Sequence, residues 1–327
     1  MLRYPESSTS NINILHFMFK KVIIFYNFME KISVKIGHKE LSVNFWKTSH
    51  ENLRGIFFIH HGMAEHIDRY KSFAEKLNSF GFHVVGHNHL GHGNNKENGE
   101  GVFAEYKGWK KVCNEACIVN DYFHDLYPDI PAFVFGHSMG AFITISSLRR
   151  IKNLKGIFLT GTFLPSKGQM FLMKILLYFE KIFFKTNENS KVHKINFQRL
   201  NSFFKNPRTD FDWLAKDINV VNKYIDDPNC GFNCSNSLWL DFIYGGELVL
   251  KEDTFLNLND DIKIFLAGGA DDPCIINGGG IDGLYDYLQK RFNNVSLRKF
   301  KGMRHEIQNE QCKDELLTLM ESFISNE

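Results

Sequence analysis

The chain has 327 residues, of which 43% are hydrophobic and 23% charged, and its formal net charge is +2 at pH 7. A chain of this length and composition can bury a large core without disulfides or metals, as one domain or one domain with an insertion. It lacks the basic excess of nucleic-acid-binding proteins, so we expect no nucleic-acid partner. The six cysteines do not follow the Cys-x-x-Cys spacing of zinc and redox motifs, which indicates reduced thiols in an intracellular protein.

Residues 1–29 form an N-terminal extension that stays unassigned. The apolar run from Ile14 to Phe28 is interrupted by Lys20 and Lys21, so it is too short to span a bilayer. It also lacks the charge placement and cleavage site of a secretory signal. A membrane-surface anchor and a true start at Met29 are both open. We expect a cytoplasmic protein, with peripheral membrane contact through this extension or through the cap described below as the alternative.

Strand patterns follow the extension. Residues 32–36 and 41–45 alternate apolar and polar side chains on either side of a Gly-His pair, which predicts an antiparallel hairpin. The later runs are short and almost continuously apolar, as in central strands that are buried on both faces. These runs occupy residues 55–59, 82–85, 132–135, 156–159 and 262–266. A more polar run at residues 295–300 predicts a strand nearer the edge of the sheet.

Helical patterns fill the intervals between these strands. They occupy residues 70–80, 107–126, 140–151, 283–292 and 313–324. Strands that alternate with helices predict an α/β fold, with a mostly parallel central sheet covered by helices on both faces.

The alternation is broken once. Residues 163–234 show helical patterns only, at 170–184, 191–204 and 211–220, and a further helix is expected at 238–250. We therefore assign 30–162 and 235–327 to the core, and 163–234 to a helical cap inserted over the carboxyl edge of the sheet. An insertion at that edge forms a lid or pocket wall. Its many apolar side chains either pack on the sheet or form a face that meets a membrane or an acyl chain.

The strongest chemical signal is the G-x-S-x-G motif Gly136-His137-Ser138-Met139-Gly140, which lies between an expected strand and an expected helix. The turn imposes strained backbone angles on the serine, and flanking glycines allow the strand and the helix to approach closely. The serine hydroxyl then projects above the sheet, beside the free N–H groups at the start of the helix. Ser138 is therefore the predicted nucleophile.

A serine nucleophile needs a base and an orienting carboxylate, and in sheets of this kind both follow the serine along the chain. His305 is the only histidine after His193, and it follows the last predicted strand, so it is the predicted base. Asp271 and Asp272 both follow the strand at 262–266, and only one of them can point toward the imidazole. We favour Asp272 and leave Asp271 open.

Acyl transfer also requires two N–H donors for the oxyanion. We expect them from Met139, next to the nucleophile, and from Met63, in the loop after the strand at 55–59. His61 in that loop is expected to order it rather than to react. The histidines at 87–92 have no acidic or cysteine ligand nearby, which favours a structural turn over a zinc site. We expect no metal and no organic cofactor.

Five blocks, HHGMAEHIDRY, HNHLGHG, FGHSMGA, GGADDP and KGMRHEIQNE, resemble those of monoacylglycerol lipases and lysophospholipases of the α/β-hydrolase superfamily, in the same order. The resemblance implies the α/β-hydrolase fold with a helical cap. It also implies a catalytic triad of Ser138, Asp272 and His305, because the pattern of glycine, two residues, aspartate and proline favours the second aspartate.

The same resemblance matches Glu65 and Arg69 to residues that hold a glycerol head group. Gln308 is the third residue that the resemblance matches to a substrate-binding position. It stands where mammalian-type monoacylglycerol lipases have a histidine, and the ending GMRHEIQNE is closer to bacterial-type lysophospholipases. We therefore expect a serine hydrolase of lipid esters, with a lysophospholipid or a monoacylglycerol as its substrate. A general carboxylesterase or peptidase on this fold, and a non-catalytic lipid-binding protein, are the alternatives.

Overall fold

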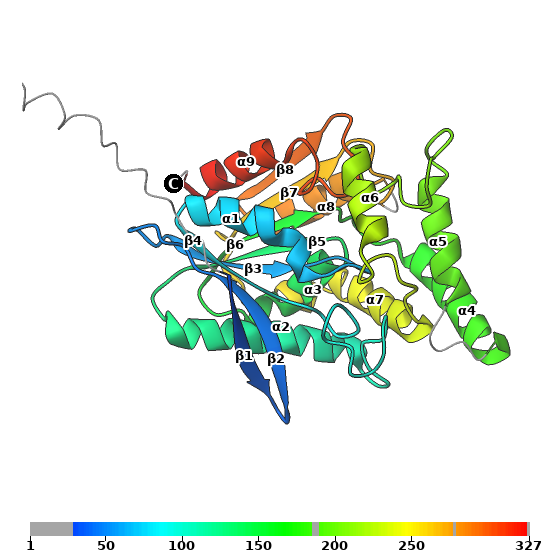
Figure 1. Ribbon diagram of the computed structural model, residues 1–327, viewed down its shortest axis with the longest axis horizontal. Coiled ribbons are helices and arrows are strands. Elements are labelled where there is room, and N and C mark those ends of the chain that lie inside the picture. Colours follow the sequence, from blue (N-terminus) through cyan, green and yellow to red (C-terminus); the bar gives the residue numbers. More distant parts are fainter. Residues whose placement is uncertain (1–28, 185–189, 277–278, 326–327) are drawn as a thin grey trace, which may run out of the picture.

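The computed structural model of the chain describes residues 29–184, 190–276 and 279–325. Its centre is an eight-stranded sheet with the strand order β1-β2-β4-β3-β5-β6-β7-β8 (Figure 1). The first two strands form the predicted antiparallel hairpin, which joins β4, and all the other neighbours pair in parallel. The strands are β1 (Met29–Ile36), β2 (Lys39–Trp46), β3 (Gly55–His60), β4 (Phe82–His87), β5 (Ala132–His137), β6 (Leu154–Thr160), β7 (Lys263–Gly269) and β8 (Val295–Phe300).

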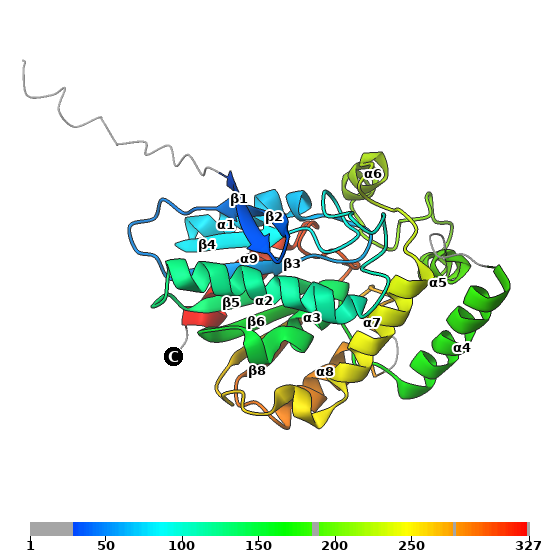
Figure 2. The same ribbon diagram turned by 90° about the horizontal axis from the view of Figure 1, so that it is seen from below.

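Helices cover both faces of this sheet (Figure 2). One buried cluster joins α1 and α9 to one face, and a larger cluster joins α2, α3 and α8 to the other. Central strands such as β3 and β5 are buried along their whole length, which explains their continuous apolar sequences. The bounds of these helices are α1 (Lys71–Ser79), α2 (Gly108–Leu126), α3 (Met139–Ser147), α8 (Gly280–Gln289) and α9 (Lys313–Ser325).

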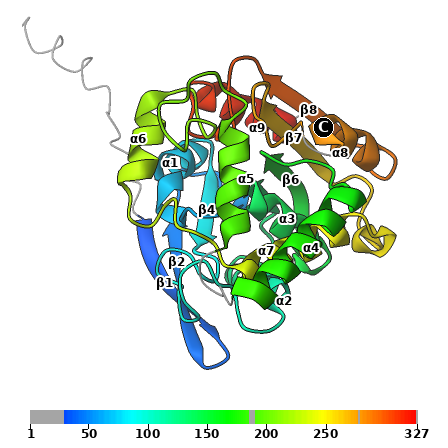
Figure 3. The ribbon, with the colours of Figure 1, turned by 90° about the vertical axis from the view of Figure 1, so that its right-hand side faces the viewer.

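Four further helices lie between β6 and β7 along the chain, and α4, α5 and α6 lie in front of the end of the sheet in Figure 3. The fourth, α7, packs against α2, α3 and α4 and so connects this layer to the core. Residues 163–234, here called the cap segment, contain the first three of these helices. The bounds are α4 (Lys167–Phe184), α5 (Lys191–Asn201), α6 (Ile218–Asp226) and α7 (Asn236–Val249).

The prediction of a helix at residues 211–220 is wrong, because α6 begins only at Ile218. Asp217 caps this helix, since its side chain accepts a hydrogen bond from the Asn219 N–H at 2.8 Å. Upstream, the carboxylate of Asp212 accepts a hydrogen bond from the Arg208 N–H at 2.6 Å, which favours a turn over a helix. Two aromatic residues of this stretch pack on neighbouring helices of the cap segment, Phe211 against Tyr224 of α6 and Trp213 against Phe197 of α5.

The N-terminal extension lies outside the described residues, apart from its last residue, Met29, which begins β1. The expectations of a surface anchor and of an alternative start therefore concern a segment that the structure does not describe. Within the part of the chain that it does describe, none of the helices is long and apolar enough to cross a membrane.

Candidate active site

Ser138 occupies a strained turn between β5 and α3. Its backbone angles are φ 52° and ψ −118°, in the left-handed half of the map that non-glycine residues seldom adopt. A Cβ atom at Gly136 would lie 2.5 Å from the Thr144 hydroxyl oxygen, and one at Gly140 would collide with the carbonyl oxygen of His60. The two flanking positions therefore have room only for glycine, as the motif predicts.

His305 and Asp272 form a buried pair. The Nδ1 atom of His305 lies 2.9 Å from an oxygen of Asp272, whose other oxygen accepts a hydrogen bond from the Cys274 N–H at 2.8 Å. Asp272 is fully buried, whereas Asp271 is exposed. A carboxylate acceptor places the proton on Nδ1, so the Nε2 lone pair is available as a base. Of the two adjacent aspartates, the structure thus brings Asp272 to the imidazole.

The ionisation of His305 is set by two opposing effects. Burial disfavours the imidazolium, but the adjacent Asp272 carboxylate favours it, and the net result is a pKa of His305 well above the ordinary value of 6.5. His305 and Ser138 both line one cavity, and His305 packs 4.7 Å, centroid to centroid, from the ring of His137. The predicted base and the predicted nucleophile therefore share one chamber.

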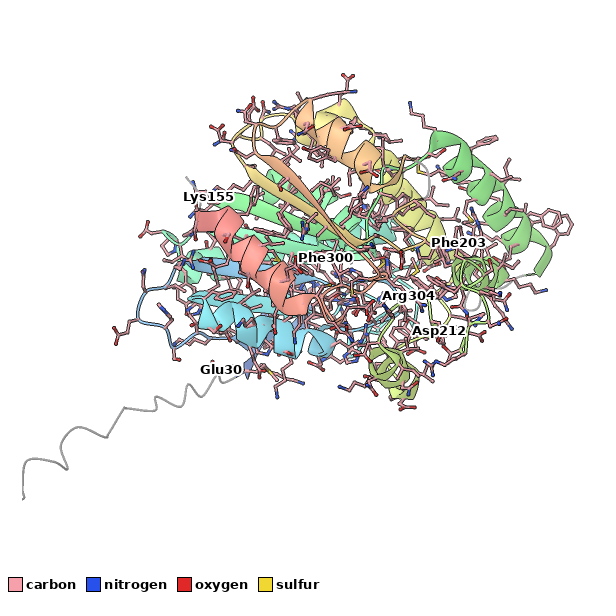
Figure 4. All side chains as sticks on the ribbon, turned by 90° about the horizontal axis from the view of Figure 1, so that it is seen from above. Glu30, Lys155, Phe203, Asp212, Phe300 and Arg304 are labelled. Atoms are coloured by element: carbon pink, nitrogen blue, oxygen red, sulfur yellow. The ribbon has the colours of Figure 1, made fainter. Side chains whose placement is uncertain are left out.

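Residues of the cap segment hold the loop that carries His305. The Glu306 N–H donates to the Leu214 carbonyl at 2.8 Å, and the ring of Trp213 lies 4.9 Å from the His305 ring. On the preceding residue, the Arg304 guanidinium donates to the backbone carbonyl of Asp212 (Figure 4). The sequence does not predict these contacts, because residues 211–220 carry a helix-like pattern and no local pattern connects them to the distant histidine.

Two buried histidines order the loop after β3. His61 lies with Nδ1 2.8 Å from the Gly62 carbonyl, and His92 lies with Nδ1 2.9 Å from the Leu90 carbonyl. The Nε2 atom of His92 accepts a hydrogen bond from the Ala64 N–H at 3.2 Å. Burial lowers the pKa of His92 to about 4 and the pKa of His61 well below its ordinary value, so both rings are neutral acceptors at neutral pH.

The two predicted oxyanion donors are found on the wall of the cavity that Ser138 also lines. Met63 and Met139 line the same cavity as Ser138 and His305. Within the described residues, neither of the two backbone N–H groups has an acceptor. The amide of Met139 is free because it begins α3, and helix starts leave their first N–H groups unpaired.

Glu65 fixes this loop from within. One of its carboxylate oxygens accepts hydrogen bonds from the Gly62 N–H at 2.6 Å and the Tyr70 hydroxyl at 2.8 Å, and the other accepts one from Arg69 at 2.6 Å. Arg69 also makes two bonds, at 2.7 and 2.6 Å, to Glu306. Glu65 lines the cavity, but Arg69 is not among its lining residues.

Gln308, the third residue that the resemblance matched to a substrate-binding position, is fully buried and does not line the cavity. Neither polar atom of its amide has a hydrogen-bond partner among the described residues. The structure therefore brings only Glu65, of the three expected head-group residues, to the wall of the cavity.

The cavity has a volume of about 520 Å³ and extends from Ser138 between the core and the cap segment. Much of its wall is apolar, including Phe163, Met173, Leu176, Phe197, Leu200 and Trp239. Polar side chains are also present, among them Ser166, Gln169, Glu180, Lys191, Asn196 and Arg199. A chamber whose wall is mainly apolar and carries a minority of polar groups is typical of a site for a mainly apolar ligand.

Potential metal ligands cluster twice in the described part of the chain. One group is His66, Asp227 and Cys230, and the other is Asp272, Cys274 and His305. In the first, the Nε2 atom of His66 lies 2.8 Å from a carboxylate oxygen of Asp227. In both groups the imidazole thus already has a carboxylate partner, and the proposed chemistry uses no metal.

Comparison with known families places this site in context. The model of the family described as serine aminopeptidase, S33 matches residues 51–312, which include both loops and the strained serine. The chain belongs to this family.

Among curated relatives, the monoglyceride lipase homolog of Monkeypox virus is 38% identical over 94 residues, or 28% of this chain and 32% of that protein. The mouse monoglyceride lipase is 32% identical over 105 residues, or 32% of this chain and 33% of that protein. The matched segment thus spans about a third of each relative's length.

Solved structures show the same fold over most of the chain. A carboxyl esterase from Bacillus coagulans has a TM-score of 0.79 at 24% identity, covering 90% of this chain and 97% of that chain. A soluble variant of monoglyceride lipase from Saccharomyces cerevisiae has a TM-score of 0.68 at 17% identity, covering 91% and 95%. The α/β-hydrolase fold and the likeness to monoacylglycerol lipases that the sequence predicts are therefore confirmed.

Proposed function

We propose that this S33-family protein is a serine hydrolase that cleaves carboxylic esters of lipids with one acyl chain, such as monoacylglycerols or lysophospholipids. One observation carries the proposal: His305, which is paired with the buried Asp272, and the strained Ser138 line one largely apolar cavity. Such a chamber favours a fatty acyl chain over a small polar substrate. The ester-lipase names of several relatives support the same class of reaction.

In the proposed reaction, the Ser138 oxygen attacks the ester carbonyl carbon while His305 Nε2 accepts its proton. The amides of Met63 and Met139 donate to the oxygen that becomes negatively charged. His305 then returns the proton to the leaving alcohol as the C–O bond breaks, which leaves an acyl-serine. A water molecule, deprotonated by His305, releases the fatty acid and restores the enzyme. Asp272 orients the imidazole and stabilises its charged form.

The cap segment supplies the acyl-binding part of the cavity in this proposal. Leu172, Leu176 and Phe179 of α4 line the cavity and are also about half exposed or more, so they lie at its opening. Other side chains of this helix are exposed too, including Phe171 at 67%, Ile182 at 70% and Phe183 at 64%. An exposed apolar helix beside a lipid-sized chamber supports peripheral contact with a lipid surface, from which a single-chain substrate enters.

An aminopeptidase would need a free anionic group near the serine to bind the substrate's terminal ammonium. Glu65 and Glu306 line the cavity on the two loops that carry Met63 and His305. Each of their carboxylate oxygens already accepts a hydrogen bond, from Arg69, Gly62, Tyr70 or Asn309. Because both carboxylates are already paired with protein donors, neither is free to bind a substrate ammonium. This supports a lipid ester over a peptide as the substrate.

The deciding experiment is a substrate panel assayed with purified protein. It contains a monoacylglycerol, a lysophospholipid and a short-chain ester, together with an aminoacyl amide. Titration of the released carboxylic acid measures the hydrolysis of the three esters on one scale. We expect kcat/KM to rise with acyl length and the amide to be inert, with all turnover absent in Ser138→Ala. Preferred cleavage of the amide, or turnover that survives in Ser138→Ala, would contradict the proposal.

A further inference from the structure

A buried polar network outside the proposed catalytic groups is built on one arginine. Arg69 donates to Glu65 at 2.6 Å through Nη1, and to the two oxygens of Glu306 at 2.7 and 2.6 Å through Nη1 and Nη2. The Arg69 side chain is 11% exposed, and each glutamate side chain is 2% exposed. Charge-assisted, bidentate bonds in such surroundings are among the strongest and most directional in proteins.

The two glutamates belong to the two loops that the proposed reaction must align. Glu306 directly follows His305, so its position constrains the imidazole. Glu65 accepts the Gly62 N–H at 2.6 Å, next to the Met63 amide. The two loops are far apart in the chain, and Arg69 contacts both.

The ring of Tyr224 also contacts the arginine. The guanidinium lies 4.9 Å from the centre of the Tyr224 ring, and the Tyr224 hydroxyl donates to the Ala64 carbonyl at 2.8 Å. Tyr224 belongs to α6 of the cap segment, so the arginine is enclosed from the side of the cap. Its Nη1 and Nη2 atoms donate to protein carboxylates, and it does not line the cavity.

We propose that Arg69 is a positioning residue that, by bridging Glu65 and Glu306, holds the Met63 amide and the His305 imidazole in register across Ser138. This inference rests on the proposed function and deepens it. It assigns Arg69 a different task from the head-group contact that the family resemblance implies. Because the Met63 amide and the His305 imidazole act on the ester group that every substrate shares, the bridge is expected to affect catalysis of every ester and not only of those with a glycerol head group.

The test compares two substrates with the same acyl chain, a monoacylglycerol and a p-nitrophenyl ester that has no glycerol. The rate of covalent labelling by a fluorophosphonate gives a third readout without any head group. In Arg69→Met, we expect kcat for both esters and the labelling rate to fall together, on the order of 100-fold, which is the size of loss that a misplacement of about 1 Å produces. KM should change little. Arg69→Lys keeps the positive charge but cannot make the same pair of hydrogen bonds to Glu306, so its kcat should fall less than that of Arg69→Met.

Glu306→Gln provides a milder break, since Arg69 keeps its bond to Glu65, and it carries the test if Arg69→Met does not fold. Lys39→Met is the matched control, because it removes the cation from the buried Glu115, 2.5 Å away, outside the cavity. The control should lose stability without losing kcat per folded molecule.

Three results would overturn the inference. A loss confined to the monoacylglycerol and expressed in KM would make Arg69 a head-group contact. Unchanged kcat in folded Arg69→Lys and Glu306→Gln proteins would leave it a purely structural residue. A wild type that neither turns over an ester nor takes up the fluorophosphonate would remove the proposed function, and this inference with it, whereas the first two results leave that function intact.

Discussion

Gly161 lies against the imidazole of His305. A Cβ atom on this glycine would be 2.7 Å from Cε1 of His305 and 2.9 Å from Cε1 of His137, and the residue has φ +59°. The position directly after β6 is thus closed to any side chain, because an added methyl group would displace the proposed base.

Gly161→Ala should lower kcat by about 100-fold, since the new methyl group moves His305 relative to Ser138. Gly37→Ala is the matched control, because Gly37 has nearly the same φ of +60° but nothing within 4 Å of its Cβ position. Both variants should lose about 1–2 kcal/mol of stability from backbone strain. Activity per folded molecule separates them, and equal activities would show that His305 tolerates the displacement or takes no part.

Asp272→Asn should reduce kcat by about 10,000-fold, because an amide keeps the shape but presents the wrong hydrogen-bonding partner to His305 Nδ1. Asp271→Asn is its natural control: the neighbouring carboxylate is exposed, so the rate should stay near that of the wild type. Steady-state rates of the two variants on one ester suffice. The assignment of the acid fails if the losses are reversed.

The acid side of the pH–rate profile should report His305. Its role as a base requires the neutral imidazole, and although burial favours that form, the Asp272 carboxylate raises the pKa of His305 well above 6.5. We therefore expect kcat/KM to rise with pH through a single ionisation whose midpoint lies above 6.5. In Asp272→Asn the midpoint of the residual activity should move to lower pH. A midpoint below 6.5 in the wild type would contradict this account.

Buried histidines should make the fold acid-sensitive. Burial, with a smaller contribution from Lys39, lowers the pKa of His87 to about 4. Between about pH 4 and 6.5 the unfolded chain therefore binds a proton that the folded chain does not, so stability is full above 6.5 and falls as the pH falls. For one such imidazole the loss approaches roughly 3 kcal/mol at pH 4.

Urea unfolding at pH 7, 6 and 5 measures this slope. It should be shallower in His87→Asn than in His50→Asn, where the replaced histidine is exposed. Identical slopes in the two variants would show that His87 does not contribute to the acid sensitivity.

The exposed face of α4 should bind lipid surfaces. Phe179 and Phe183 have rings 4.3 Å apart and are 54% and 64% exposed. Burying one phenylalanine is worth about 1.5–3 kcal/mol, so replacing both with serine should weaken binding to liposomes by tenfold or more. Tyr106→Ser, which removes an aromatic ring 69% exposed on the core, should bind like the wild type. Co-sedimentation with liposomes measures the difference, and equal binding of the double variant would remove the membrane contact.

Local patterns in the sequence predict most of the architecture. The runs around Phe57, Val134 and Phe158 predict strands because burial on both faces excludes polar residues from them. The glycines on either side of Ser138 predict the strained turn, since no other residue fits there. In these places the local structure is determined by residues that are close together in the sequence.

Long-range contacts could not be predicted in the same way. The pair Arg69–Glu306 joins residues 237 positions apart, and neither partner carries a local signature of the other. Likewise, Trp213 belongs to an apolar pattern that resembles a helix face. In the structure its ring packs against His305, on a loop that is distant in the sequence. Such contacts depend on how the sheet, its loops and the cap segment pack against one another in the folded protein.

The most direct test of the central claim is covalent labelling of the wild-type protein by a fluorophosphonate, with the modified residue identified by peptide mass spectrometry. The account predicts a single adduct on Ser138, formed rapidly in the wild type and much more slowly in His305→Ala. An unlabelled folded protein, or an adduct on a different residue, would contradict it.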